Sequence, residues 1–326
     1  MGIKHLNKFL KENAINSIKF ISLSDLSGKK IAIDISIYMY KYASEGTLIE
    51  NIYLMLAIFR LYNVIPIFVF DGKPPTEKNE LLLKRRQDKN AAKDEYNKLK
   101  NKLVNNDYID ESEKQDIINS MDMLKRRFVN INRSDIENIK QLIMSYGATY
   151  YDAPGEADEL CAMLTIKGKV WACLSEDMDM FVYGCPRVIR YLSLLNHTAV
   201  IYHIPGILEN LGISQKELRE ICVLSGTDYT SLNDETKNEN NLYTTLKYFK
   251  KYHKENSKIG FYDWLIENTD YIKDYDNLKN IYNIFDLNTG HFGVKVFESI
   301  KIINGPILKE NINNILKLEG FLFPQN

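Results

Sequence analysis

The sequence has little cysteine and no long apolar run, and each shortage excludes a class of protein. Its four cysteines show no CxxC spacing, so we expect buried free thiols, not disulfides or a zinc site. No apolar stretch approaches the ~20 residues of a membrane span. The N-terminus Met1-Gly2-Ile3-Lys4-His5 lacks the apolar core of a signal peptide. These absences predict an intracellular protein that has no membrane partner.

Net charge is also nearly absent, because the formal total is −1. The charges are nevertheless unevenly distributed, with nine Lys or Arg against four acids between residues 78 and 102. Acidic motifs lie on both sides of this basic segment. Such an arrangement fits a polyanion that must be both held and cut.

The order of the elements predicts an α/β fold. Apolar, β-branched runs alternate with helical stretches of ten to fifteen residues, among them 47–62, 134–145 and 214–224. Ser134 with Glu137 forms a capping box for the second of these, and Ser214 caps the third. Strands are expected at residues 31–37, 65–70, 148–152, 170–174, 188–193 and 198–203. This alternation predicts a mostly parallel, twisted sheet with helices on both faces.

Carboxylates follow the predicted strands. Asp71 comes directly after the strand 65–70, and Asp34 lies inside the strand 31–37, where a charge is costly unless it is paired or metal-bound. Glu156, Asp158, Asp177 and Asp179 lie beside two further strand ends. Ligands of such sheets bind beyond the carboxyl ends of the strands. So many acids would repel one another without cations, and the pattern therefore indicates a magnesium site.

Spacing alone does not select the ligands within Gly155-Glu-Ala-Asp-Glu159. On a regular helix Glu156 and Glu159 share a face, whereas Glu156 and Asp158 converge only in a first turn, which Pro154 favours. Both alternatives stay open on spacing. Asp177 and Asp179 are two residues apart, so in an extended loop their side chains point the same way.

Residues 76–133 are charged and rich in asparagine, and they read as a helical hairpin inserted after Asp71. Lys78 and Arg85 are seven residues apart and share a helix face. Farther along, Asp228 lies in a loop. Lys247, Lys250, Lys251 and Lys254 form a helix face that is either a rail for phosphates or a solvated surface.

Six motifs in order resemble the flap endonuclease family, the structure-specific 5′ nucleases of DNA replication and repair. The resemblance covers roughly residues 1–230. It rests on Met1-Gly2-Ile3, Ile33-Asp34-Ile35-Ser36, Phe70-Asp71-Gly72-Lys73-Pro74-Pro75, Ala153-Pro154-Gly155-Glu156-Ala157-Asp158, Glu176-Asp177-Met178-Asp179 and Ser225-Gly226-Thr227-Asp228-Tyr229.

The resemblance implies a centre of seven carboxylates that holds two Mg²⁺ ions, with Mn²⁺ as a substitute. One ion would be served by Asp34, Asp71, Glu156 and Asp158, and the other by Asp158, Asp177, Asp179 and Asp228. Two such ions activate water, align an in-line attack on a phosphodiester and stabilise the leaving oxygen. The resemblance also prefers Asp158 over Glu159 as a ligand.

The same resemblance assigns roles outside the carboxylates. Lys78 and Arg85 match the cations that the family places at the scissile phosphate, in a helical arch over 76–133. Tyr40 matches a tyrosine that stacks on a base, although an ordinary core tyrosine is an equal alternative. Gly2 matches a position near the site. Further substrate contacts are expected from the arch residues Lys84, Arg86 and Lys89.

The chain departs from the family pattern at three places. Asp158 stands where glutamate is common, a choice seen also in the 5′ exonuclease branch. Thr230 to Asn240 replaces the Gly-Ile-Gly hairpin that grips duplex DNA with a potassium ion, so neither the ion nor that grip is expected. The Lys247 to Lys254 face is our conjectured substitute. The tail 318–326 lacks the aromatic motif that binds the sliding clamp, and we expect a monomer without that partner.

We therefore expect a Mg²⁺-dependent 5′ flap endonuclease with 5′ exonuclease activity, acting on DNA with a flap, nick, gap or free 5′ end, in the nucleus or at a site of viral replication. Residues 1–222 would form the nuclease core and residues 223–326 a C-terminal helical DNA-binding region. The alternatives are a mainly exonucleolytic or gap-cutting enzyme, a catalytically silent nucleic-acid-binding protein, and an RNA-directed nuclease. Seven filled acidic positions disfavour the silent protein.

Overall fold

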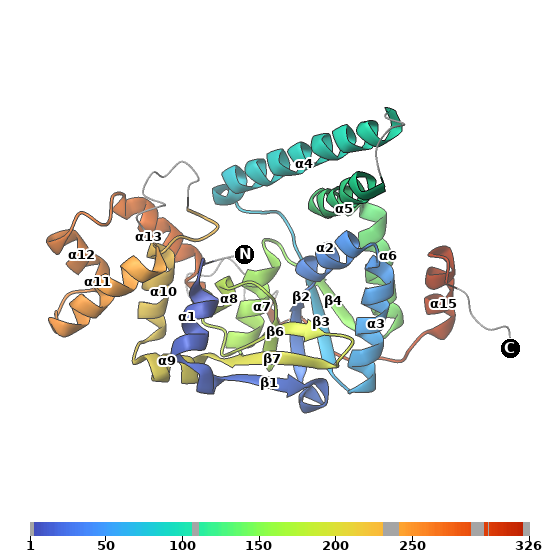
Figure 1. The fold of residues 1–326 in the computed structure, drawn as a ribbon. Coiled ribbons are helices and arrows are strands. Elements are labelled where there is room, and N and C mark those ends of the chain that lie inside the picture. Colours follow the sequence, from blue (N-terminus) through green and yellow to red (C-terminus); the bar gives the residue numbers. More distant parts are fainter. Residues whose placement is uncertain (1–2, 106–110, 231–240, 288–296, 299, 322–326) are drawn as a thin grey trace.

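A single sheet organises the computed structural model, which describes residues 3–105, 111–230, 241–287, 297–298 and 300–321 (Figure 1). The strands lie in the order β1-β7-β6-β5-β2-β3-β4. Strands β6, β5, β2, β3 and β4 are parallel to one another, and at one edge β7 pairs antiparallel with both β6 and β1. The sheet is thus mostly parallel, as the sequence predicts. The strands are β1 (Ile18–Ser22), β2 (Lys30–Asp34), β3 (Ile65–Phe70), β4 (Thr149–Asp152), β5 (Ala172–Leu174), β6 (Arg187–Ser193) and β7 (Thr198–His203).

Helices cover both faces of the sheet, because the buried strands are apolar on both sides. In β2, Ile31 and Ile33 face one hydrophobic cluster while Ala32 faces the other. The first face packs against α2 (Ile35–Glu45), α3 (Leu48–Leu61), α6 (Arg133–Ser145) and α15 (Lys309–Leu318). The second packs against α1 (Leu6–Asn13), α7 (Ala157–Ile166), α8 (Asp179–Tyr183), α9 (Ile204–Leu211) and α10 (Gln215–Leu224). Helices α11 (Leu242–Lys254), α12 (Phe261–Asn268) and α13 (Tyr275–Ile284) extend the same cluster by packing on α10 (Figure 1).

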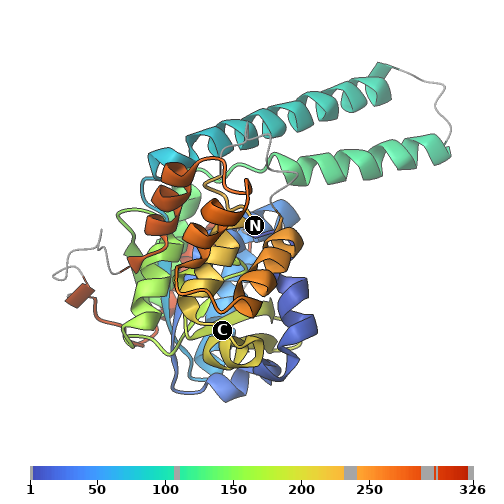
Figure 2. The same ribbon diagram turned by 90° about the vertical axis from the view of Figure 1, so that its left-hand side faces the viewer.

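The segment after β3 forms the expected helical insertion. A short 3₁₀ helix, η3 (Thr76–Lys78), leads into α4 (Asn79–Asn105), and α5 (Glu111–Arg127) returns toward the body. Figure 2 shows α4 and α5 side by side, projecting beyond the rest of the molecule. Two other 3₁₀ helices, η1 (Ile15–Ser17) and η2 (Leu23–Leu26), flank β1.

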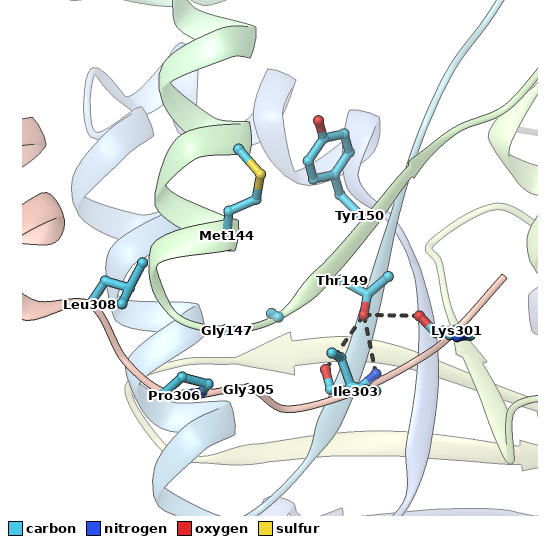
Figure 3. A pocket seen from close by; sticks show the side chains of 10 residues that line it. Met144, Gly147, Thr149, Tyr150, Lys301, Ile303, Gly305, Pro306 and Leu308 are labelled. Carbon is cyan, nitrogen blue, oxygen red and sulfur yellow. Dashed lines mark hydrogen bonds between the residues drawn. The ribbon is translucent and has the colours of Figure 1, made fainter.

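A C-terminal strap, residues 300–308, passes the start of the edge strand β4 (Figure 3). The Thr149 hydroxyl donates to the Lys301 carbonyl and accepts from the Ile303 amide. Gly147 has a φ of 71°, and a Cβ there would lie 2.4 Å from the Gly305 carbonyl oxygen. Gly147 is therefore required for this close approach. The strap thus holds the start of this edge strand through the Thr149 hydroxyl and the Gly147 carbonyl, which accepts from the Gly305 amide.

The boundaries correct two expectations. Strand β2 ends at Asp34, and α2 begins at Ile35, so Asp34 lies at the strand end and not inside the strand. The apolar run 31–37 spans both elements because both are buried there. The capping box of α6 uses Asn132 and Asp135, two residues before the expected pair.

The expected division at residue 222 falls within α10. Buried residues of α12 and α13 belong to the same hydrophobic cluster as those of α7 and α8. Within the described residues, none of the helices combines the length and apolarity that crossing a bilayer requires.

Candidate metal centre

The seven predicted carboxylates come from the carboxyl ends of β2, β3 and β5 and from the loops and helix starts beside them. Asp34 is the last residue of β2 and Asp71 follows β3 directly. Glu156 is the N-cap of α7 and Asp158 its second residue. Asp177 follows β5, Asp179 begins α8, and Asp228 lies in the loop after α10. We call Asp34, Asp158, Asp177 and Asp179 the floor of the site, and Glu156 and Asp228, with the cations that meet them, its rim.

The floor carboxylates perturb one another and are largely withdrawn from water. Asp34, Asp158 and Asp179 are between 1% and 8% exposed. Burial, followed by Asp71 and Asp177, raises the pKa of Asp34 to about 8. Burial and then Glu156 raise the pKa of Asp158, and burial and then Asp177 raise that of Asp179. The floor therefore holds negative charge only at a cost.

Two cations from the arch neutralise the rim. Lys78 Nζ lies 2.8 Å from Glu156 Oε1 and 2.7 Å from its Oε2. Arg85 Nη2 lies 2.8 Å from Asp228 Oδ2. Burial lowers the pKa of Lys78, but Asp158 and Glu156 raise it by more, so its net shift is upward. The base of the arch is thus tied to the acidic edge of the sheet.

Close backbone packing sets the position of the loops that bear Asp71 and Glu156. The Gly72 amide donates to the Gly155 carbonyl over 2.7 Å. A Cβ on Gly72 would lie 1.9 Å from the Ala153 carbonyl oxygen, so no other residue fits. Asp71 Oδ1 accepts from the Ala157 amide over 2.8 Å, at the start of α7.

The start of α7 bears on the two ligand pairs left open by spacing. Because the helix begins at Ala157, Glu156 and Asp158 lie together in its first turn. Each of the two perturbs the same Lys78 ammonium group. Asp158 and Glu156 therefore converge as the first-turn alternative predicts.

The Ser175–Asp179 loop differs from the extended loop that we expected. Asp179 is the first residue of α8, and its amide donates to Asp177 Oδ1 over 3.0 Å. The Ser175 hydroxyl accepts from the Asp177 amide and donates to Asp34 Oδ2 over 3.3 Å. A turn closed by side-chain acceptors, which periodicity does not register, replaces the extended backbone.

Two oxygens of the floor fit the chemistry of a hard cation. Asp34 Oδ1 and Asp179 Oδ1 are fully buried and lack a hydrogen-bond partner among the described residues. Buried polar atoms are normally satisfied, and carboxylate oxygens are what Mg²⁺ prefers. The donor set thus fits a divalent cation. In the part of the chain described here, however, no three His, Cys, Asp or Glu side chains already converge as a ligand set.

Tyr40 lies at the surface of α2, 49% exposed, which excludes the core alternative. Lys89 Nζ lies 5.0 Å from the centre of its ring and donates to the Val129 carbonyl. Lys84 and Arg86 are exposed on α4. The arch thus presents cations beside an accessible aromatic ring.

The remaining residues expected to contact the substrate lie on α11 or outside the described residues. Lys247, Lys250, Lys251 and Lys254 are all exposed on α11. Lys251 also lies 4.0 Å from Glu255 and packs over the Trp264 ring. Gly2 and residues 231–240, which hold most of the segment replacing the hairpin, lie outside the described residues.

Sequence reasoning gave no role to Tyr229 or Ser175. The Tyr229 hydroxyl donates to Glu156 Oε2 over 2.5 Å, and its ring lies 4.5 Å beneath Lys78 Nζ. Tyr229 therefore joins both members of one rim pair. Two positions in the sequence could have indicated these roles. Tyr229 directly follows Asp228, and Ser175 directly follows β5.

Two family models match the chain in the regions that form this site. The XPG N-terminal domain matches residues 1–92, and the XPG I-region matches residues 147–228. Together they cover just over half of the chain and leave out most of the arch and all of α11–α13. All seven carboxylates fall within the two matched segments.

Curated relatives share about three residues in ten with the chain. Flap endonuclease 1 of Uncinocarpus reesii is 31% identical over 247 residues, which are 70% of this chain and 59% of that protein. Flap endonuclease 1 of Trypanosoma brucei gambiense is 32% identical over 251 residues, 70% of this chain and 61% of that protein. The match thus spans about three-fifths of these relatives.

Solved structures share the fold over nearly the whole chain. The catalytic core of Rad2 in complex with a DNA substrate has a TM-score of 0.65 at 19% identity, over 95% of this chain and 93% of that one. Flap endonuclease-1 from Methanococcus jannaschii has a TM-score of 0.55 at 20% identity, over 93% and 97%. The likeness includes the C-terminal helices that the family models leave out.

Proposed function

The chain belongs to the flap endonuclease family, and from that premise we propose that it is a divalent-metal-dependent 5′ nuclease that cuts DNA at 5′ flaps and removes nucleotides from free 5′ ends. One observation supports this most strongly. Seven carboxylates from separate elements gather at the carboxyl edge of the sheet, beside two cations from the arch. Proteins of similar sequence are named flap endonucleases.

In this proposal the floor acids, the rim acids and Asp71 hold two Mg²⁺ ions, with Mn²⁺ as a substitute and without K⁺. Asp34, Asp71, Glu156 and Asp158 would hold one ion, and Asp158, Asp177, Asp179 and Asp228 the other. When bound, the ions lower the pKa of water and stabilise the charge on the oxygens of the cleaved phosphodiester. The unpartnered oxygens of Asp34 and Asp179 support this assignment.

Lys78 and Arg85 would act on the phosphate itself. Each has a movable side chain and lies at the rim, bound to Glu156 or Asp228. If Glu156 and Asp228 held ions, the side chains of Lys78 and Arg85 would be free to turn toward the scissile phosphate. There they stabilise charge on the non-bridging oxygens.

The other contacts would hold the DNA. Tyr40 would stack on a base near the cut, with Lys84, Arg86 and Lys89 beside it on the backbone. Gly2 would lie near the site. The exposed Lys247, Lys250, Lys251 and Lys254 would follow the duplex as part of a helical region, residues 223–326, attached to the nuclease core 1–222 of a monomer.

A cleavage assay tests the proposal. End-labelled 5′-flap, nicked, gapped, blunt-duplex and RNA substrates are incubated with Mg²⁺, with EDTA, and with the Asp177→Asn protein. We expect Mg²⁺-dependent cleavage of DNA that both EDTA and the substitution abolish. Cleavage that survives either one would overturn the two-ion centre.

Glu159→Gln is the matched control. Glu159 neighbours Asp158 on α7 but is not assigned to an ion. We expect this protein to cleave at nearly the wild-type rate. A loss equal to that of Asp177→Asn would show that the ligands within residues 155–159 are misassigned.

A mainly exonucleolytic enzyme is a second candidate, because Thr230 to Asn240 replaces the family's duplex-gripping hairpin. An enzyme that lacks this grip would locate free 5′ ends better than junctions. The same assay separates the two activities by product length. A single oligonucleotide released at the flap junction favours the endonuclease, and a ladder of 5′ mononucleotides favours the exonuclease.

A further inference from the structure

A buried arginine outside the seven carboxylates holds the loop that bears two of them. Arg190 lies on β6 and is 7% exposed. Its Nη2 donates to the Glu176 carbonyl over 2.8 Å, and its Nε lies 3.6 Å from Glu176 Oε2. Glu176 lies directly between Ser175 and Asp177. One guanidinium group therefore binds both the backbone and the side chain of the loop.

A distortion of β6 directs these groups at the loop. The pairing of β6 with β7 shifts register between Arg190 and Ser193, and Tyr191 has a φ of 55°. A tyrosine in the left-handed region is strained, and such strain persists where the surroundings impose it. The Tyr191 amide donates to Glu176 Oε1 over 2.6 Å. At the bulge, β6 gives up its regular pairing with β7. The Arg190 guanidinium and the Tyr191 amide instead donate to Glu176 in the loop.

Helix α1 completes the arrangement. Asn7 Oδ1 accepts from Arg190 Nη1 over 3.1 Å and from the Tyr202 hydroxyl over 2.8 Å. Asn7 Nδ2 donates to the Tyr191 hydroxyl over 2.7 Å. Asn7 therefore fixes both residues of the bulge from the far side. It also connects the N-terminal helix to the Ser175–Asp179 loop.

We propose that Arg190 and Asn7 form a clamp that positions Asp177 and Asp179 for one of the two ions. The clamp rests on the proposed two-ion centre. Asp177 and Asp179 lie in one tight turn, in which the Asp179 amide donates to Asp177 Oδ1 and the Asp177 charge raises the pKa of Asp179 after burial does. Without an outside restraint this turn would open to separate the charges. Arg190 and Asn7 touch neither carboxylate, so they are positioning residues.

Mn²⁺ binding measured by electron paramagnetic resonance tests the clamp without DNA and without turnover. We expect the wild-type protein to bind two ions. In Arg190→Lys, which keeps the charge but loses the two-point grip, the affinity of one ion should fall by about 10- to 100-fold, the range typical for outer partners of metal ligands. The other ion should bind as in the wild type.

Two further variants keep the test decisive if Arg190→Lys does not fold. Asn7→Ala and Glu176→Gln alter the clamp from its other ends, and each should weaken the same ion. Arg187→Lys is the matched control, because Arg187 is the first residue of β6, outside the bulge, and stacks on Trp171. It should leave both affinities unchanged.

Thermal unfolding in EDTA separates positioning from general stability. A merely structural Arg190 would lower the melting temperature of the lysine variant in EDTA and leave both Mn²⁺ affinities at the wild-type values, and that result would overturn the clamp. Equal loss of both ions would also overturn it. A wild-type protein that binds no Mn²⁺ would instead refute the two-ion centre itself.

Discussion

The floor and the rim of the acidic site differ in what neutralises them. The rim acids Glu156 and Asp228 each meet a cation from the arch. Three of the floor acids, Asp34, Asp158 and Asp179, are buried, and two floor oxygens lack a partner in the described structure. The protein therefore satisfies its rim by itself and leaves its floor to a ligand. Because Lys78 and Arg85 already bind the rim acids, these two cations are in place before the substrate binds.

Neutralising the floor should have the largest effect. Asp179→Asn removes one buried charge with little change of shape, so cleavage should fall by more than the ~10³-fold that removal of a single hydrogen-bond donor costs. The melting temperature in EDTA should rise, because repulsion with Asp177 and Asp158 is removed. Calorimetry with and without Mg²⁺ measures the second effect. A variant that melts lower in EDTA would show that the floor is not strained by its charges.

Removing a rim cation should have a smaller effect on rate and the opposite effect on stability. Lys78→Met should lower kcat by about 10²–10³-fold while DNA binding changes little. It should also lower the melting temperature in EDTA, since Glu156 loses its partner. Lys73→Met, at an exposed lysine in the preceding loop, is the control. A drop in affinity with unchanged kcat would place Lys78 in binding and not in chemistry.

Charge reversal on α11 should affect binding alone. In Lys250→Glu/Lys251→Glu, duplex affinity should fall, and the slope of log K against log salt should flatten by ~0.9 for each phosphate that the protein no longer neutralises. The matched control is Lys309→Glu/Lys317→Glu on α15, which lies at the opposite end of the molecule (Figure 1). Identical salt slopes in wild type and the α11 variant would leave that face as solvated surface.

Glu220 offers a buried carboxylate outside the site, and its effect should be the smallest. Burial, opposed by Lys216, raises its pKa from 4.5 to about 7. A raised pKa stabilises the fold fully below pH ~4.5, and that stability is lost as the pH rises through ~7. Glu220→Gln should therefore raise the free energy of unfolding at pH 8 by roughly 2–3 kcal/mol and by less at pH 5. Melting curves at both pH values, with the exposed Glu209→Gln as control, measure this. A gain that is equal at both pH values would refute the titration.

The sequence located helices and strands most accurately where a single hydrophobic period was bounded by a turn or a capping residue. The strand Ile65–Phe70 and the helix capped by Ser214 lie where expected. The end of β2 was misplaced, because Ile35 and Ile37 continue an apolar run after the backbone has turned helical. Local patterns report burial, and only tertiary packing decides which element is buried.

The same distinction between local patterns and tertiary packing applies to the candidate metal centre. Strand ends located the acids, since parallel strands place their carboxyl ends at one edge. The turn at Asp179 and the bulge at Arg190 depend on contacts between distant segments. Arg190 meets Asn7 across 183 positions of sequence. No periodicity encodes such a contact.

The strap over β4 has a consequence for the order in which the molecule assembles. Thr149 and Lys301 are 152 positions apart, so their contact closes a long loop and forms late in folding. Until then, the start of this edge strand lacks the contact, and the edge of a sheet is the part that can pair with another chain. On the ribosome, residues 147–149 emerge well before residues 300–308 are made, so this edge waits longer for its last contact than the central strands do.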